Sequence, residues 1–281
     1  MGSYLDQKLF SNFFYNVFVF DLEYVGKDTN LSNCYIWDIG IVHINTGQRF
    51  SITIDPGMRP LPKPFSSEFI ELDENILNNR KATTYKLAWK AVIYWVEQLR
   101  NKSYPLLFIS HNSFKGDKIM LEIEIKRNNL KFPYDWFFFD SLIFCRFALP
   151  KLSSYALADL YYFKSGCHMK NAHYALPDAI YLSELLNLIG WNMIEGPIYP
   201  FNCTSLQVVK WLGPSCEKIF FNNQILCLED LKQFLISSYS MNCLNGINVK
   251  LKEYIIYKIT DFGIKEGNSI SITNSLLERW L

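Results

Sequence analysis

The sequence has almost no net charge, no apolar run long enough to cross a membrane and no paired cysteine motif. Its 281 residues include 28 Lys and Arg against 27 Asp and Glu, a net charge of +1. A strongly basic, histone-like binder is therefore excluded, and any contact with nucleic acid must come from local patches. The longest apolar stretches, such as residues 13–20 (FFYNVFVF), fall short of the roughly 20 residues that a transmembrane helix needs, so we expect no membrane segment.

Targeting and redox signals are equally sparse. The N-terminal residues lack the basic, apolar and small-residue regions of a secretory signal, and the 7 cysteines are an odd number with no CxxC pair. Free thiols in a reducing compartment are the default for this pattern. We therefore expect an intracellular protein, cytoplasmic or nuclear, that is not secreted and carries no structural zinc site.

The sequence does contain enough apolar surface for a large core. Hydrophobic residues make up 49% of the chain and aromatic residues 16%, which suits one large domain or two small ones. Gly and Pro cluster in residues 190–204 (GWNMIEGPIYPFNCT), where we place a domain boundary. The prediction is a first domain over residues 1–192 and a second over residues 200–281.

The first domain alternates between strand-like and helix-like patterns. Continuous β-branched and aromatic runs predict strands, and apolar residues at helical spacing predict helices. The order of these elements indicates an α/β fold, a mixed sheet flanked by helices. The predicted strands are residues 17–22, 35–44, 49–54, 106–110 and 136–140, and the predicted helices are residues 84–99, 117–127, 154–163 and 177–189, with a Pro-rich loop at 55–64.

Asp21 and Glu23 directly follow the apolar run VFVF. Side chains alternate along a strand, so both carboxylates project to one face and Leu22 projects to the other. Two acids on one face can share or bridge a metal ion. An isolated pair also fits a solvated strand end, but charge directly after a buried run is costly unless it is paired or bound to metal.

Two further polar groups stand at the ends of predicted elements. His111 and Asn112 follow the strand at residues 106–110, and Asp117 opens the next helix, where an acid can be a metal ligand or only a cap. His173 and Asp178 would face about 140° apart on an unbroken helix. Because proline suits the first helical turn, Pro177 places Asp178 on the helix and His173 on the segment before it. A surface histidine beside a helix-terminal acid is the alternative interpretation.

Four acids and one imidazole together match the needs of two-metal phosphodiester cleavage. Two divalent ions about 3.5–4 Å apart can bind a scissile phosphate. Hard cations such as Mg²⁺ or Mn²⁺ prefer carboxylate oxygens, and an imidazole suits the role of general base.

In order and spacing these motifs resemble the DEDDh 3′→5′ exonucleases, which have an RNase H-like fold and include proofreading subunits, RNase T and the three-prime repair exonucleases. The resemblance covers roughly residues 14–190. The motifs that carry it are DLE (21–23), HNSFKGD (111–117) and HYALPDA (173–179), with FDSL (139–142) and SSYALADLYYF (153–163) as the family's strand and leucine-rich helix.

The resemblance implies a metal-dependent 3′→5′ exonuclease that releases nucleoside 5′-monophosphates from DNA or RNA. Its partner would be a nucleic acid with a free 3′ end, single-stranded or frayed. His173 would be the general base, and Lys115, beside the acid motif, is a candidate phosphate contact. Two Mg²⁺ or Mn²⁺ ions would be held by Asp21, Glu23, Asp117 and Asp178, and the other residues expected near the substrate are Leu22, Tyr24, His111 and Asn112.

One position leaves the proton acceptor open. The sister DEDDy branch carries a tyrosine four residues before the last aspartate, where Tyr174 stands, whereas His173 stands five before it, as in the DEDDh branch. Ala175 and Ala179 match the histidine pattern, so we expect His173 to act.

Residues 200–281 are expected to form a small, mainly helical accessory domain. Residues 205–236 predict helices around a Leu-Gly-Pro turn, weakly similar to helix-hairpin-helix modules, which present backbone amides to phosphates. An ordinary helical domain, for contact with a protein partner or for packing, is the favoured interpretation. Two other functions remain open for the whole chain: a non-catalytic nucleic-acid-binding module, and a proofreading or interaction subunit of a polymerase or RNA-processing complex.

Overall fold

The computed structural model describes residues 16–26, 30–61, 71–104, 106–133, 135–170, 172–190 and 199–200. The chain divides into two compact units, Met1–Phe201 and Asn202–Leu281, and every described residue belongs to the first. The predicted helical accessory domain therefore lies outside the described residues, apart from position 200. None of the helices in the described part of the chain is long and apolar enough to span a membrane.

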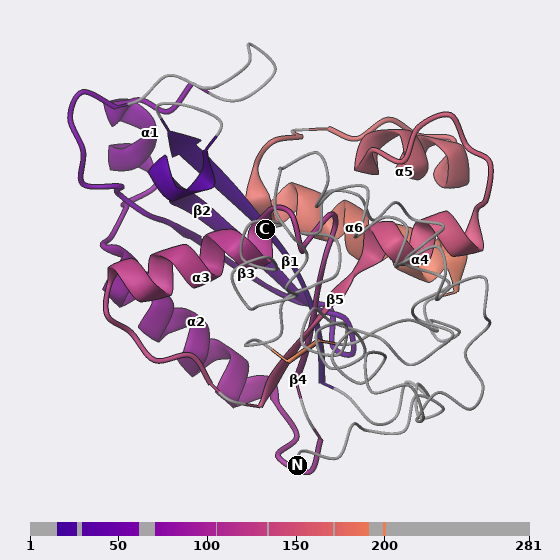
Figure 1. Ribbon diagram of the computed structural model, residues 1–281, viewed down its shortest axis with the longest axis horizontal. Helices are drawn as coiled ribbons and strands as arrows, with labels where there is room; N and C mark the ends of the chain where they lie inside the picture. Colours follow the sequence, from indigo (N-terminus) through magenta and orange to yellow (C-terminus); the bar gives the residue numbers. More distant parts are fainter. Residues whose placement is uncertain are drawn as a thin grey trace, which may run out of the picture. The chain divides into compact units, whose positions relative to one another are not determined.

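A six-stranded mixed sheet forms the centre of the described unit, in the order β3-β2-β1-β4-β5-β6. Figure 1 shows β1 (Asn16–Gly26) between β2 (Cys34–His43), its antiparallel neighbour, and β4 (Leu106–Ser110), its parallel one. The outer pairs are β2 with β3 (Gln48–Thr53), antiparallel, β4 with β5 (Trp136–Asp140), parallel, and β5 with β6 (Tyr199–Pro200), antiparallel.

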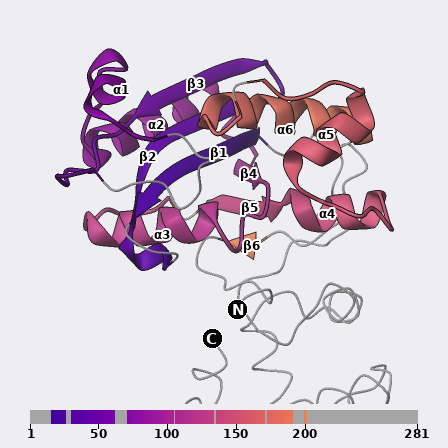
Figure 2. The same cartoon turned by 90° about the horizontal axis from the view of Figure 1, so that it is seen from above.

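Helices cover both faces of this sheet, as Figure 2 shows. On one face α6 (Ala175–Ile189) lies across β1 and β2, with α5 (Leu157–Ser165) packed against it. On the other face lie α2 (Tyr85–Leu99) and α3 (Asp117–Arg127). The remaining helices among the described residues are η1 (Leu31–Asn33), α1 (Glu74–Asn79) and α4 (Ser141–Ala148). The predicted mixed sheet flanked by helices is confirmed.

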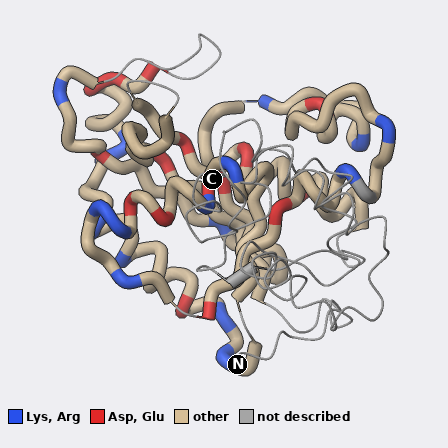
Figure 3. The backbone as a smooth tube through the Cα atoms, viewed as in Figure 1, with Lys and Arg blue, Asp and Glu red and all other residues tan. Residues whose placement is uncertain are grey.

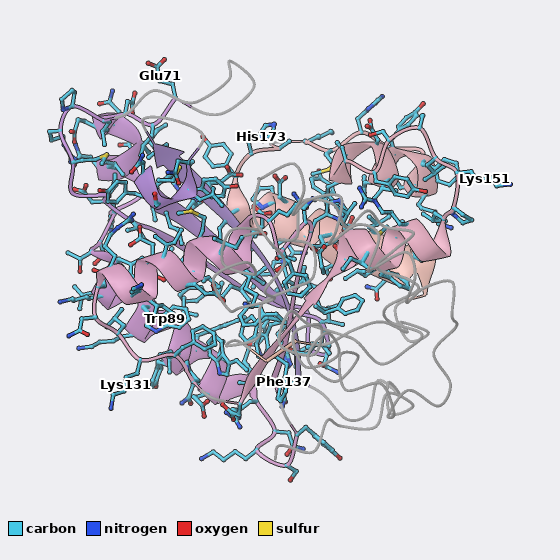
Figure 4. All side chains as sticks on the ribbon, in the orientation of Figure 1. Glu71, Trp89, Lys131, Phe137, Lys151 and His173 are labelled. Carbon is cyan, nitrogen blue, oxygen red and sulfur yellow. The ribbon has the colours of Figure 1, made fainter. Side chains whose placement is uncertain are left out.

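The two faces of β1 pack against different partners. Val17 and Val19 join the apolar cluster that includes Leu182 and Leu185 of α6. Phe18 and Phe20 point the other way and join an aromatic cluster that also contains Phe108, Trp136 and Trp89, the last of which Figure 4 labels on α2. Because side chains alternate along a strand, residues 21 and 23 continue the face that α6 covers.

Several element boundaries differ from the sequence prediction. The strand predicted at 17–22 continues to Gly26 past a register shift between Glu23 and Tyr24, so the two acids lie within the strand and not at its end. Helix α6 begins at Ala175, two residues before the predicted start, and α5 begins at Leu157 instead of residue 154. Within FDSL, Ser141 opens helix α4, which was not predicted. The bounds of β4, α3 and β5 agree with the prediction.

Candidate functional site

Three elements bring the four predicted acids close enough together for their charges to interact. Asp21 and Glu23 lie on the α6 face of β1, and Asp178 lies in the first turn of α6. Asp117 is the first residue of α3, at the end of the loop that follows β4. The charges of Asp117, Glu23 and Asp178 all act on Asp21 and disfavour its ionisation. The predicted carboxylate constellation is therefore a spatial cluster.

Glu23, His173 and Asp178 form a close group within this cluster. One potential ligand atom of each lies within 4.8 Å of the others. The backbone N–H of His173 donates a hydrogen bond to Asp178 Oδ2 (3.0 Å), and His173 has a left-handed backbone with φ of 67°. Figure 4 shows His173 on the segment that leads into α6. The His173 imidazole therefore lies close to the Asp178 carboxylate, although the two residues are five apart in the sequence.

Burial and mutual repulsion make these acids hard to ionise. Burial, and then the charge of Asp117, raise the pKa of Asp21 well above its usual value. Burial, and then the charge of Asp178, raise the pKa of Glu23 to about 8. Burial likewise raises the pKa of Asp117 to about 8 and that of Asp178 to about 6, the latter against the hydrogen bond from His173. Because ionisation of these buried, neighbouring carboxyl groups is unfavourable in the free protein, binding of a cation among them is favoured.

The donor set fits a hard divalent cation. All four acids offer carboxylate oxygens, the ligands that Mg²⁺ and Mn²⁺ prefer. Asp178 Oδ1 is buried and has no hydrogen-bond partner among the described residues, which leaves one oxygen available for a metal. Figure 3 shows Lys and Arg interspersed with Asp and Glu over the described unit.

The two rivals for the proton acceptor lie in different surroundings. The Tyr174 ring packs edge-on against Trp37, with ring centroids 6.1 Å apart. The guanidinium of Arg80 lies 5.2 Å from the centroid of the Tyr174 ring. His173, by contrast, lies beside Glu23 and Asp178. The structure therefore places the imidazole among the carboxylates and the tyrosine ring against an arginine and a tryptophan.

Two residues of β2 that set the position of α6 were not predicted from the sequence. Asp38 is fully buried, faces Glu23 in the strand register, and accepts a hydrogen bond from the Ala175 N–H at 3.3 Å. Gly40 faces Asp21, and a Cβ there would lie only 2.2 Å from the Ala175 carbonyl carbon. The sequence signal that could have identified them is an acid and a glycine inside the otherwise apolar run YIWDIGIVHI.

Asp140 was also missed, although it organises the loop that carries Asp117. This buried residue ends β5 and caps α4 by accepting from the Leu142 N–H at 2.9 Å. Its second oxygen accepts from the Phe114 N–H at 3.2 Å, inside the 111–117 loop. Burial raises its pKa to about 6. Asp140 therefore holds the start of α3 from the neighbouring strand.

The residues predicted near the substrate have different surroundings. Leu22 is buried, and Tyr24 is half-buried, with its pKa raised by burial and then by the charge of Asp117. Asn112 and Lys115 are exposed.

His111 differs from the other substrate candidates because both of its ring nitrogens have protein partners. Nδ1 lies 3.0 Å from Ser141 Oγ, and Nε2 lies 2.8 Å from the Tyr155 carbonyl oxygen. Burial lowers its pKa to about 4. Its contacts in the structure are internal, and its contact with substrate stays a prediction.

Comparison with known proteins gives matches at the level of structure. No protein-family model matches the chain, and no curated protein matches it. A 3′-exonuclease structure described as specific recognition of the 3′ end of a histone mRNA stem-loop matches at a TM-score of 0.54 and 15% identity, over 67% of this chain and 68% of that one.

Two further structures belong to the same group of proteins. A full-length 3′-exonuclease matches at a TM-score of 0.54 and 15% identity, over 66% of this chain and 86% of that one. The nuclease domain of a DEDDh-family 3′-exonuclease bound to rAMP matches at 0.49 and 16% identity, over 67% of this chain and 98% of that one. The resemblance predicted from the motifs is confirmed in the fold: the described unit has the RNase H-like architecture of the 3′-exonucleases.

Proposed function

We propose that the chain is a divalent-metal-dependent 3′→5′ exonuclease acting on DNA or RNA. The observation that carries the proposal is the grouping of Glu23, His173 and Asp178 within 4.8 Å, together with the electrostatic interaction of Asp21 and Asp117 with the acids of this group. Its fold neighbours are 3′-exonucleases, one of them recognising the 3′ end of an RNA stem-loop. Both facts support a nuclease, and the acids support a metal-dependent one.

In this proposal Asp21, Glu23, Asp117 and Asp178 hold two divalent cations. Such ions, when bound, acidify a water molecule and stabilise an oxyanion leaving group. The His173 imidazole accepts the proton of the attacking water. The hydrogen bond from the His173 backbone to Asp178 keeps the imidazole beside the carboxylates. The products are a nucleoside 5′-monophosphate and a strand one nucleotide shorter.

The substrate contacts proposed around this centre follow from the motif resemblance. Leu22 and Tyr24 flank Glu23 on β1 and would lie near the terminal nucleotide. Asn112 and Lys115 are exposed on the loop before Asp117 and would follow the strand. The partner is a nucleic acid with a free 3′ end, and residues 200–281 remain a candidate for contact with a protein partner.

A single assay tests this function. Single-stranded DNA, duplex DNA, single-stranded RNA and an RNA stem-loop, each 5′-labelled, are incubated with the full chain in Mg²⁺, in Mn²⁺ and in EDTA. The proposal expects a ladder of one-nucleotide steps on at least one substrate, which EDTA abolishes. Asp178→Asn should abolish it too, whereas Asp159→Asn, which changes an exposed acid on α5, should not.

Two outcomes would contradict the proposal. Degradation that continues in EDTA would remove the metal mechanism. A wild-type protein that binds these nucleic acids but degrades none of them in either metal would favour the non-catalytic module. Co-purification with a polymerase would point to the subunit alternative.

A further inference from the structure

The start of α6 is held by a carboxylate from a distant strand. The N-cap residue Tyr174 makes no side-chain capping hydrogen bond within the described part of the chain. The first N–H groups of a helix need partners from outside it. Asp38 Oδ2 supplies one by accepting from the Ala175 N–H at 3.3 Å, across 137 residues of sequence. The segment that carries His173 and Asp178 is therefore anchored by β2.

The same strand sets how closely this segment approaches the acids of β1. Asp38 pairs with Glu23 in the register, and Gly40 pairs with Asp21. Because a Cβ on Gly40 would lie 2.2 Å from the Ala175 carbonyl carbon, the first residue of α6 sits directly on the strand backbone. The absence of a side chain at Gly40 makes this close approach possible, and Asp38 orients the start of the helix by accepting the Ala175 N–H.

Arg80 completes the anchor. Its Nη1 donates to Asp38 Oδ2 at 3.0 Å, and this oxygen is the one that accepts from Ala175. Its guanidinium also lies over the Tyr174 ring, 5.2 Å from the centroid. Asp38 is fully buried beside an acidic cluster, where an unpaired charge would be costly. Arg80 both neutralises it and fixes the residue next to His173.

We propose that Asp38 and Arg80 are positioning residues that hold the His173–Asp178 segment against Glu23. They touch neither substrate nor metal; they act through the backbone at the start of α6. The catalytic consequence rests on the proposed function, whereas the anchoring itself does not. A displacement of about 1 Å at a reacting group can cost on the order of 10²-fold in rate, so a loosened anchor should be visible in kcat.

Hydrogen–deuterium exchange of the full chain tests the anchor without any activity. Asp38→Ala should accelerate amide exchange in residues 172–179 by about tenfold or more, the cost of losing a helix cap. Asn16→Ala is the matched control, because Asn16 is also a buried strand residue that anchors a distant backbone. Its side chain donates to the Asn101 and Tyr104 carbonyls at 2.9 and 3.0 Å. The control should accelerate exchange near residues 101–104 and leave 172–179 unchanged.

A second variant covers the case in which Asp38→Ala does not fold. Asp38→Asn keeps the shape of the side chain but loses the charge that pairs with Arg80, so it should accelerate exchange in the same segment by a smaller factor. Unchanged exchange at residues 172–179 in a folded Asp38 variant would overturn the inference. Equal acceleration of that segment by Asn16→Ala would also overturn it, since the effect would then be general.

Metal binding and kinetics add readouts that a loss of stability alone would not move. Asp38→Ala should weaken Mn²⁺ binding to the metal-free protein by about 10- to 100-fold, as expected when the support of a ligand is removed. On a cleaved substrate it should lower kcat while leaving KM near that of wild type. Wild-type kcat in Asp38→Ala would overturn the positioning role. An inactive wild-type protein would overturn the proposed function alone, because exchange and Mn²⁺ binding still decide the anchor.

Discussion

The two faces of β1 differ in their side chains and in their effect on stability: one is aromatic and the other carries two acids. On the face toward α2 and α3, Phe18 and Phe20 pack in an aromatic cluster around Phe108. On the face toward α6, Val17 and Val19 give way to Asp21 and Glu23. One face removes apolar surface from water, which stabilises the fold. The other confines like charges, which destabilises the fold in the absence of a cation.

This difference separates the roles of neighbouring residues along one strand. Substitutions in the aromatic cluster should change stability and leave the chemistry alone. Substitutions on the acidic face should abolish the chemistry and, in metal-free protein, raise stability. The four predictions below test that separation.

The largest effect is expected from Asp21→Asn. The amide cannot replace the carboxylate as a metal ligand, and loss of several kcal/mol of metal-dependent stabilisation should lower kcat by about 10²–10⁴-fold. In EDTA at pH 8 the same variant should melt at a higher temperature than wild type, because it removes a buried carboxyl group whose pKa is raised by burial and by neighbouring acids. Activity close to wild type would break the proposed separation, as would a lower melting temperature in EDTA.

Phe108→Ala should show the reverse pattern. Phe108 is buried and stacks on Trp136 with ring centroids 4.2 Å apart. The cavity should lower the free energy of unfolding by about 3–5 kcal/mol. Urea denaturation measures this loss, and kcat is measured well below the midpoint, where it should stay close to wild type. Phe108→Leu leaves a smaller cavity and serves as the milder control. A folded Phe108 variant with strongly reduced kcat would show that the two faces are coupled.

Local patterns in the sequence predicted most of the elements that build these faces. The bounds of β4, α3 and β5 could be predicted because Pro105, the turn before Asp117, and Asp140 interrupt apolar runs at the points where the elements begin or end. Helix α4 escaped prediction because it follows β5 with no intervening loop. The apolar residues of its sequence, SLIFCRFA, therefore run on from those of the strand WFFFD.

The four acids and His173 could be predicted together from their motifs, but the residues that hold them in position could not. Asp38 reads as one polar residue in an apolar strand, and its partners Arg80 and Ala175 lie 42 and 137 residues away. A local sequence pattern does not reveal contacts between residues so far apart in the chain. The contacts of His111 show the same limit, because the Tyr155 carbonyl that accepts its hydrogen bond lies 44 residues further along the chain.

The acidic face should make stability depend on pH and on metal. Glu23 and Asp117 have a folded pKa of about 8, against 4.5 and 3.8 for the ordinary groups. Between these values the native state keeps protons that the unfolded state has lost, so the free energy of unfolding in EDTA should fall as pH rises toward about 8. A divalent cation at about 100 times its Kd should restore roughly 2.7 kcal/mol at pH 8.

Protons compete with the cation, so the gain from metal should shrink toward pH 5. Thermal melts with Mg²⁺, Mn²⁺ or EDTA across this range would measure both trends. Asp178→Asn is the control in which the metal gain should be largely lost. Stability in EDTA that rises steadily from pH 5 to pH 8 would mean that the acids do not repel one another as the structure indicates.

Tyr174→Phe should have the smallest effect, and it separates the two candidate proton acceptors. The Tyr174 ring packs against Trp37 and Arg80, and phenylalanine keeps those ring contacts. We therefore expect kcat to stay near wild type, whereas His173→Ala should lower it by about 10²–10⁴-fold, as for the loss of a general base. Single-turnover measurements over a range of pH compare the two variants directly. If Tyr174→Phe abolished cleavage and His173→Ala did not, the proton acceptor would be the phenol, and the position of His173 beside Glu23 and Asp178 would need another explanation.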